Sequence, residues 1–288
     1  MLFKLDEVRS LLTIVLILPW AVASLGQGAL SPVQAQALVH RALSTELRAA
    51  QDTSHPMRYR LRKSSPRLTS TKEILETRDG DVARLVAVFD KPLSPTDELQ
   101  EQARLDTLAG DPTRQRHRKQ NEEEDAGIVF KLLRMMPKAF VYQYAGVGAG
   151  PSGSVQKFTF KPSPGFSPPD METQALTSMT GEIWIDAAQE RVARLEGHLE
   201  QDTDYGWGIL GKLNKGGWIV LEQADVGNRQ WRIVRLRMQM SLRVFFKNKS
   251  FDTVEEMTQY APLPLGLSYV RAIQMLRGAP DPSAYDNR

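Results

Sequence analysis

The sequence contains no cysteine and only four histidines, His40, His55, His117 and His198. Without cysteine, structural disulfides, thiol catalysis and thiolate-bound metals are excluded, and so is a lipid anchored on a cysteine. The histidines stand far apart, and none has the spacing of a metal ligand pair. We therefore expect no metal, no cofactor and a fold stabilised by apolar burial alone.

A strong excess of one charge is also missing. The sequence has 37 Lys and Arg and 34 Asp and Glu, which gives a net charge of +3. Such a balance does not favour nucleic acid as a partner. Catalytic signatures such as Gly-x-Ser-x-Gly are absent as well. Glu200, Asp202 and Asp204 alternate, a pattern that fits a polar strand end or a cation site. Only their convergence with His198 in a cleft would support a secreted hydrolase, so we predict no catalytic residues.

Long apolar runs are limited to Leu11–Leu18, which only Thr13 interrupts. Pro19 ends the run, and Ala21-Val22-Ala23 has the small-x-small pattern of a signal-peptidase site, which predicts cleavage after Ala23. The run is shorter than the roughly 20 residues that a membrane-spanning helix needs. We expect residues 1–23 to be a secretory signal and the remainder to be exported in soluble form; an uncleaved anchor is the alternative.

The most regular pattern in the chain covers Val234–Phe246, where apolar and mostly basic residues alternate. Alternation with period two predicts a strand with one apolar face and one basic face. A strand of thirteen residues exceeds the usual ~5–6, and this length favours a strongly curved sheet. Arg58, Arg60 and Arg62 repeat the arrangement. These arginines fit either a solvated outer sheet face or a contact with phosphates or anionic lipid heads.

The first half of the chain mixes helices and strands. Ser31, Pro32 and Gln34 predict a capped helix start, and Ser94 predicts another. The pair Asp79-Gly80 predicts a hairpin turn between strands at 70–78 and 82–90. The charged block 111–125 is typical of a solvated helix face or a mobile loop, and a binding site is the less favoured reading. The helix that follows it is expected to stop at Pro137.

The second half is predicted to consist mainly of strands. They are expected at 140–144, 155–160, 181–186, 191–197 and 218–224, with a Gly-rich turn between the first two. Asp252-Thr253-Val254-Glu255 has the form of a capping box and predicts a short helix there. A last helix is expected at Leu267–Leu276, followed by a loose tail.

The segment Gly181-Glu182-Ile183-Trp184-Ile185-Asp186, a short polar turn and the return strand Arg191–Gly197 carry a family likeness. With the helix and strand order of Pro32–Pro264, it resembles the periplasmic lipoprotein-carrier (LolA/LolB-type) superfamily. The resemblance implies an α+β fold in which a strongly curved antiparallel sheet, an incomplete β-barrel, has helices over its concave side. It also implies a single lipid-binding domain over residues 24–264, with a C-terminal helix and tail at 265–288.

A Gly-rich loop, Tyr205–Gly211, departs from that family pattern and carries Trp207, Ile209 and Leu210. These side chains fit either a cap on the open end of the sheet or an apolar lip beside Lys212 and Lys215. Methionines on the apolar face of the long strand suit an adaptable pocket, although they also fill ordinary cores. The predicted ligand-binding residues are Leu236, Met238, Met240, Leu242, Trp207, Ile209 and Leu210.

The function expected from these features is a non-enzymatic periplasmic carrier that holds a lipid or lipoprotein acyl chain inside a half-open barrel. A membrane-associated protein is a further expected partner. The alternative is a protein-protein interaction or sensory module of the cell envelope on the same fold. The space beneath the long strand should discriminate between them.

Overall fold

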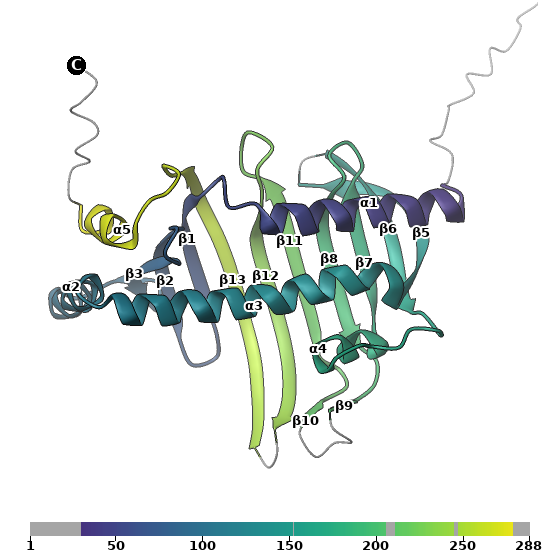
Figure 1. Ribbon diagram of the computed structural model, residues 1–288. Coiled ribbons are helices and arrows are strands. Elements are labelled where there is room, and N and C mark those ends of the chain that lie inside the picture. Colours follow the sequence, from purple (N-terminus) through teal and green to yellow (C-terminus); the bar gives the residue numbers. More distant parts are fainter. Residues whose placement is uncertain (1–29, 152, 206–210, 245–246, 279–288) are drawn as a thin grey trace, which may run out of the picture.

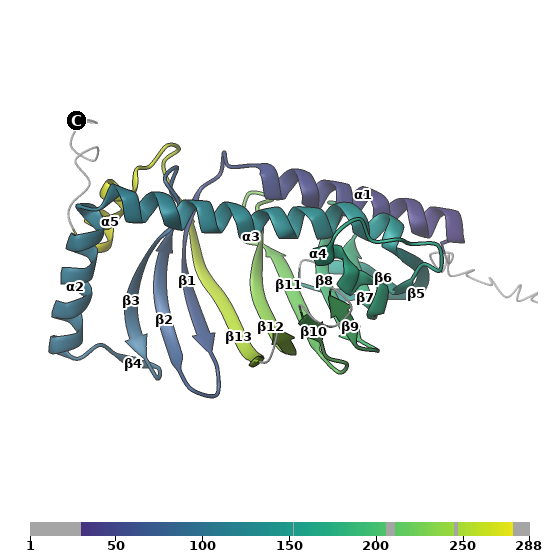
Figure 2. The same cartoon turned by 60° about the horizontal axis from the view of Figure 1, so that its bottom comes forward.

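The computed structural model describes residues 30–151, 153–205, 211–244 and 247–278. Within these ranges the chain forms one antiparallel sheet of 13 strands, in the order β4-β3-β2-β1-β13-β12-β11-β8-β7-β6-β5, with β10 beside β12 and β9 beside β10. The strands β4 and β5 at the two ends do not pair with each other, so the sheet is curved but open (Figure 2). The predicted α+β fold with an incomplete barrel is confirmed.

The strand bounds follow the chain in order. They are β1 (Met57–Ser64), β2 (Thr69–Leu75), β3 (Val82–Val88), β4 (Lys91–Pro92), β5 (Phe140–Gly150), β6 (Gly153–Pro162), β7 (Met179–Asp186), β8 (Arg191–Leu199), β9 (Thr203–Tyr205), β10 (Gly211–Leu213), β11 (Trp218–Asp225), β12 (Trp231–Val244) and β13 (Lys247–Pro262). The helices are α1 (Pro32–Gln51), α2 (Pro95–Ala109), α3 (Pro112–Ala139), α4 (Met171–Gln174) and α5 (Tyr269–Leu276), with a 3-10 turn at Ala175–Ser178.

Helices α1 and α3 cross one face of the sheet, and α2 and α5 stand at the end near β3 and β4 (Figure 1). The predicted capping box starts α1, where Ser31 Oγ accepts from the Gln34 N–H at 3.3 Å and Gln34 Oε1 accepts from the Ser31 N–H at 3.0 Å. The charged block 111–125 forms the N-cap and the first half of α3, so the prediction of a helix there is confirmed, and most of its side chains are exposed while Gln115 is buried. That helix runs past Pro137 to Ala139. Across the described ranges, no helix has the length and apolar character to cross a membrane.

The long predicted strand is β12, but its alternation is broken once. Leu221 pairs with Leu236 and Gln223 pairs with Ile233, so Val234 is the extra residue of a β-bulge. A bulge shifts the alternation by one, and Ile233 and Leu236 therefore face the same side. The apolar face predicted from the sequence begins at Leu236 rather than at Val234.

The short helix predicted from the capping box at Asp252 is wrong, because these residues belong to β13. This strand pairs with β1 on one side and with β12 on the other. Backbone hydrogen bonds to two neighbours outweigh a local cap, which is worth only about 1 kcal/mol.

Two main cores fill the space between helices and sheet, and a third, small cluster joins Val155, Ala193 and Trp231. The larger lies between α1, the end of α3 and β5–β8, and includes Leu38, Val39, Met136, Phe158 and Ile183. The smaller lies between β2, β3, α2 and α5 and includes Leu75, Val82, Leu105, Leu108 and Ile273. Neither core extends beneath the middle of the sheet, where β1, β13, β12 and β11 meet.

Candidate functional site

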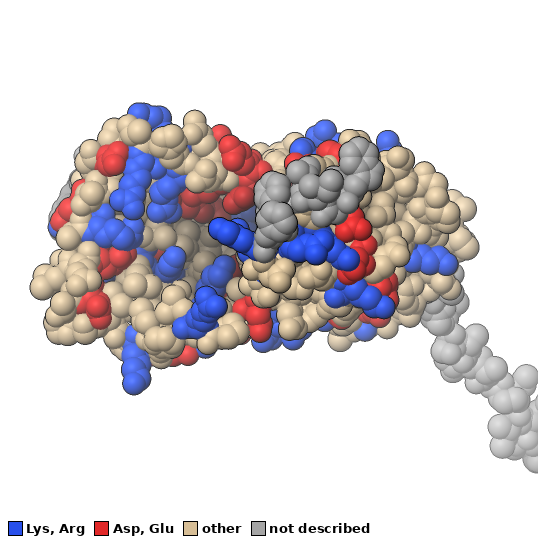
Figure 3. Space-filling view, turned by 90° about the horizontal axis from the view of Figure 1, so that it is seen from below, with Lys and Arg blue, Asp and Glu red and all other residues tan. Residues whose placement is uncertain are grey.

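A cavity of about 340 Å³ occupies this middle region, between α1, α3 and strands β1, β7, β8, β11, β12 and β13. This volume lies within the range of roughly 300–1,000 Å³ typical of small-ligand sites. Seen from below, the molecule is hollowed in the half that contains β1–β3 (Figure 3). The apolar part of the cavity wall consists of Leu43, Val129, Leu133, Met136, Ile183, Leu195, Leu221, Ile233 and Met257.

One row of opposed residues explains why the sheet side of the cavity is apolar. Ile183 pairs with Leu195, Leu195 with Leu221 and Leu221 with Leu236. Opposed residues in antiparallel strands point to the same face, so these aliphatic side chains form a ladder. Ile183 is fully buried in the larger core, while Leu221 and Leu236 are only half-buried. The ladder thus leads from the packed core into the open half of the sheet.

Beyond Leu236, the row of aliphatic side chains continues with two charged residues. The residue opposite Leu236 on β13 is Glu255, and the residue opposite Glu255 on β1 is Lys63. Their side chains form an ion pair at 2.6 Å. In this row the inner face is therefore apolar across β7, β8, β11 and β12 and polar at β13 and β1.

Aromatic side chains form the opposite side of the cavity. The rings of Tyr59 and Tyr260 are stacked with centroids 5.1 Å apart. The Tyr260 hydroxyl donates to the Ile233 carbonyl at 2.6 Å. Burial raises the pKa of both phenols, which therefore stay neutral and present apolar ring faces. Trp231 is 4% exposed and also lies at the cavity wall.

A buried ion pair holds α1 against the sheet next to the cavity. Arg191 of β8 donates to both carboxylate oxygens of Glu46, at 2.8 and 3.0 Å. The Val192 N–H and the Gln223 side-chain amide also donate to Glu46, at 2.8 and 3.1 Å. Every carboxylate oxygen is satisfied, so the pair is a structural clamp rather than a free acid or base.

The cavity opens into a polar vestibule of about 620 Å³ that shares Ala49, Ala50, Glu76 and Arg232 with it. Acidic side chains outnumber basic ones in its lining. Burial and the nearby Glu122 and Glu76 raise the pKa of Asp81 to about 7, and burial also raises the pKa of Glu76. The Glu76 carboxylate accepts from the Met57 N–H at 2.8 Å.

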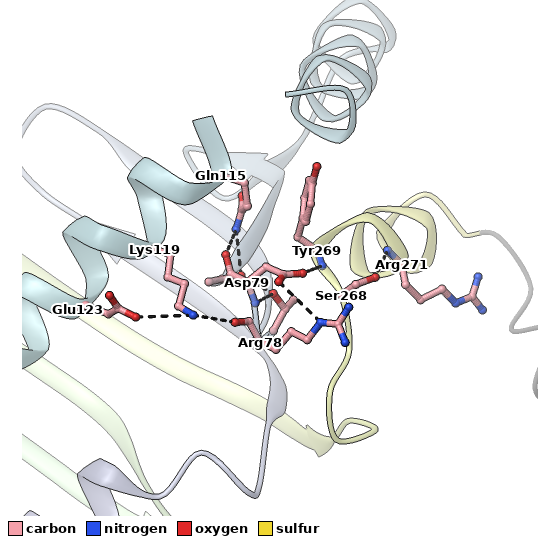
Figure 4. Close-up of polar contacts among 10 residues, drawn as sticks. Arg78, Asp79, Gln115, Lys119, Glu123, Ser268, Tyr269 and Arg271 are labelled. Atoms are coloured by element: carbon pink, nitrogen blue, oxygen red, sulfur yellow. Dashed lines mark hydrogen bonds and ion pairs between the residues drawn. The ribbon is translucent and has the colours of Figure 1, made fainter. Parts of the chain in front are cut away.

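The wall of the vestibule is a polar attachment of α3 to the turn between β2 and β3. Gln115 donates to the carbonyls of Asp79 and Gly80 at 3.0 and 3.1 Å, and Lys119 donates to the Arg78 carbonyl at 3.1 Å (Figure 4). One turn further along α3, Glu122 Oε2 accepts from the Asp81 N–H at 2.9 Å.

Gly80 allows this close approach. Its φ is +93°, and an added Cβ would lie 2.9 Å from Glu122 Oε2 and 3.0 Å from Lys119 Cβ. The same turn also holds α5, because Asp79 Oδ2 accepts from the Tyr269 N–H at 3.0 Å. The turn therefore fastens two helices to the sheet by polar contacts.

The predicted site residues divide into two groups. Strand register places Leu236, Met238, Met240 and Leu242 on the inner face, partly exposed, but none of them is among the residues around the cavity. Trp207, Ile209 and Leu210 lie outside the described residues. Sequence reasoning missed Tyr59, Trp231, Met257 and Tyr260 as site residues, the last two because β13 was not expected to be a strand.

The acidic residues considered for a cation or a hydrolase do not converge. Asp202 forms an ion pair with Lys212 at 2.6 Å, and Glu200 accepts from the Thr180 hydroxyl at 2.9 Å. His198 contacts Glu196 on its own strand at 3.0 Å. Among the described residues, no group of three or more potential ligands is placed to hold a metal ion.

Comparison with known proteins gives one structural likeness. No family model matches the sequence, and no curated protein matches it. A crystal structure of a domain from Vibrio parahaemolyticus, provisionally described as an outer membrane lipoprotein-sorting protein domain, is similar with a TM-score of 0.29 and 11% identity. The match covers 79% of this chain and 93% of that chain. The fold assignment rests on the strand order and the helix placement.

Proposed function

We propose that this chain is a non-enzymatic carrier of the bacterial periplasm that binds an acyl chain of a lipid or lipoprotein. The single observation that carries the proposal is the apolar cavity between α1, α3 and the sheet. A wall of Leu, Ile, Val and Met side chains favours hydrocarbon, at about 0.8 kcal/mol for each buried methylene group.

The position of α3 supports this role. In this helix only Gln115, Met136 and Ala139 are buried, so its middle turns cross the cavity without packing into a core. Val129, at the cavity wall, is 50% exposed. A ligand in the cavity would cover these apolar side chains, which the chain itself leaves partly in contact with water.

The test is binding of a fluorescent fatty acid to the purified protein, combined with mass spectrometry of lipid that remains bound after gentle purification. We expect saturable binding, and we expect Leu221→Trp to weaken it by about tenfold because the larger ring fills the cavity. Val129→Trp should act in the same direction with less effect on folding, since Val129 lies on the exposed helix. Leu99→Trp, at a 67% exposed position of α2, is the matched control and should bind normally.

Two results would overturn the proposal. One is the absence of saturable fatty-acid binding in a folded wild-type protein. The other is wild-type affinity in both cavity variants, which would place any bound lipid elsewhere.

A further inference from the structure

On its β13 side, the hairpin of β12 and β13 extends past the neighbouring strand β1, whereas on the other side β10 pairs with β12 at Leu242, Arg243 and Val244. The last pair between β1 and β13 is Ser64 with Val254, and the first residue of β11, Trp218, pairs with Gln239. Beyond these points β13 pairs with β12 alone, down to Lys247. The hairpin therefore projects below the turn between β1 and β2, as Figure 1 shows.

The inner face of this projection is apolar and basic together. Met240 lies opposite Phe251, and Leu242 lies opposite Lys249. Phe251 is 39% exposed, although it stands in the middle of a regular strand pair. A large exposed aromatic ring flanked by long cationic side chains is typical of surfaces that enter the interface of a bilayer.

The cations of the projection form no ion pair within the described part of the chain, whereas several arginines higher on the sheet are paired. Arg62 and Arg235 bind Glu256, and Arg194 binds Glu222. By contrast, Arg243, Lys247 and Lys249 form no ion pair within the described part of the chain. Asp252 is the acidic residue among them, so this segment carries three positive charges against one negative.

Two neighbouring turns at the same end of the sheet have the same character. Leu68 is 47% exposed and adjoins Arg67, and Phe89 is 59% exposed and lies two residues before Lys91. The Phe89 N–H donates to the Thr69 carbonyl at 2.7 Å, which holds the two turns side by side. Seen from this end, Lys and Arg side chains gather around the hollow in the sheet (Figure 3).

We propose that the β12–β13 projection and these two turns form a docking surface for an anionic lipid bilayer. The unpaired cations would face lipid phosphates, and Phe251, Leu68 and Phe89 would enter the headgroup region. Strand addition by a protein partner fits less well, because lysines on the exposed edge of β13 oppose it. Met240, Met238 and Leu236 share the face of Leu242, so docking would place the bilayer at the start of an apolar path toward the cavity. This last step rests on the proposed function, whereas docking itself does not.

The experiment is co-sedimentation of the purified chain with vesicles of phosphatidylcholine containing about a quarter phosphatidylglycerol, against vesicles of phosphatidylcholine alone. Lys247→Glu with Lys249→Glu should lower the bound fraction on anionic vesicles by about tenfold or more, and Phe251→Ser by less. Binding should also weaken when salt rises from about 0.1 M to about 1 M. The matched control is Arg134→Glu with Lys138→Glu, an equal charge change at exposed positions of α3. Residues 1–29 are common to all variants and cancel in the comparison.

Equal sedimentation with both vesicle types, or an equal loss in the control variant, would overturn the docking surface. So would a stoichiometric protein partner that requires Lys247 and Lys249 while lipid does not. Fatty-acid binding without vesicles separates the two proposals. The docking variant should keep that binding, and a wild-type protein that docks but binds no fatty acid would overturn the carrier function alone.

Discussion

The two halves of the sheet use the same helices differently. Beneath β5–β8, α1 and the end of α3 press on a dense group of aromatic and aliphatic side chains, in which the rings of Phe140 and Phe160 lie 4.6 Å apart. Beneath β1, β12 and β13, the same α3 crosses a cavity, and the sheet bears the Lys63–Glu255 ion pair on its inner face. The region beneath β5–β8 is densely packed, whereas the region beneath β1, β12 and β13 keeps a space open.

The attachment of α3 differs in the same way. Its last turns are held by apolar burial at Met136 and Ala139. Its first turns are held by hydrogen bonds to the turn around Asp79 and Gly80. Apolar burial depends little on pH, whereas polar contacts beside titrating carboxylates depend on it, so the two ends should respond to different perturbations.

The largest effect is expected from truncation in the packed half. Phe158→Ala should lower the free energy of unfolding by about 4 kcal/mol, because a fully buried ring leaves a void among fixed neighbours. Leu221→Ala, at the cavity wall, should cost only about 1 kcal/mol, since its side chain already adjoins empty space. Denaturant unfolding of both variants measures the difference, and equal losses would contradict the contrast between the halves.

The second largest loss of stability is expected when the buried ion pair between Glu46 and Arg191 is broken. Glu46→Gln leaves the buried Arg191 guanidinium without a counter-charge and should destabilise the fold by about 3 kcal/mol. Arg41 and Glu190 also join α1 to the sheet region, at 2.7 Å, but their side chains are 56% and 36% exposed. Glu190→Gln should therefore cost less than about 0.5 kcal/mol. Thermal and urea unfolding would refute this ranking if both variants lost the same stability.

The polar attachment of α3 should make the free energy of unfolding depend on pH. Burial and Glu122 raise the pKa of Asp81 from 3.8 to about 7, so in this window the folded state keeps a proton that the unfolded chain releases. The free energy of unfolding should fall as pH rises through the window. Asp81→Asn removes the titration, and its stability should change less with pH than that of the wild type. An unchanged slope in the variant would show that other groups control it.

The smallest effect concerns the middle of α3. An added Cβ at Gly127 meets nothing within 4 Å, so packing does not require glycine there. Gly127→Ala should stabilise the fold by about 0.5–1 kcal/mol through helix propensity alone. Gly80→Ala is the informative counterpart, because its φ of +93° and its contact with Glu122 should make the same change destabilising. Loss of stability in the Gly127 variant would mean that the middle turns pack on the sheet after all.

The sequence was most informative where local signals and tertiary contacts agree. The caps at Ser31 and Ser94, the turn at Asp79-Gly80 and the strands β7 and β8 appear as predicted, and β12 does so apart from the bulge at Val234. It was least informative at β13, where a local capping motif competes with pairing to β12, the preceding strand, and to β1, which lies far away in the chain. Missing that strand also hid Met257 and Tyr260, the two residues that β13 contributes to the cavity wall.

The candidate site shows the same limit. The apolar alternation correctly placed Leu236, Met238, Met240 and Leu242 on the inner face. It did not show that the covered cavity lies higher, at Leu221 and Ile233, because the bulge at Val234 and the path of α3 are consequences of packing. Which part of an apolar face is roofed by a helix depends on elements distant in sequence.

By itself, the sequence determined that this chain folds without disulfides into helices over a long, one-sided antiparallel sheet, since period and caps are local properties. Only the tertiary structure decided that the helices pack on a dense core beneath β5–β8 and that α3 crosses a cavity beneath β1, β12 and β13. That outcome depends on where α3 is fastened, and its fastening at Gly80 and Met136 joins residues that no local pattern connects.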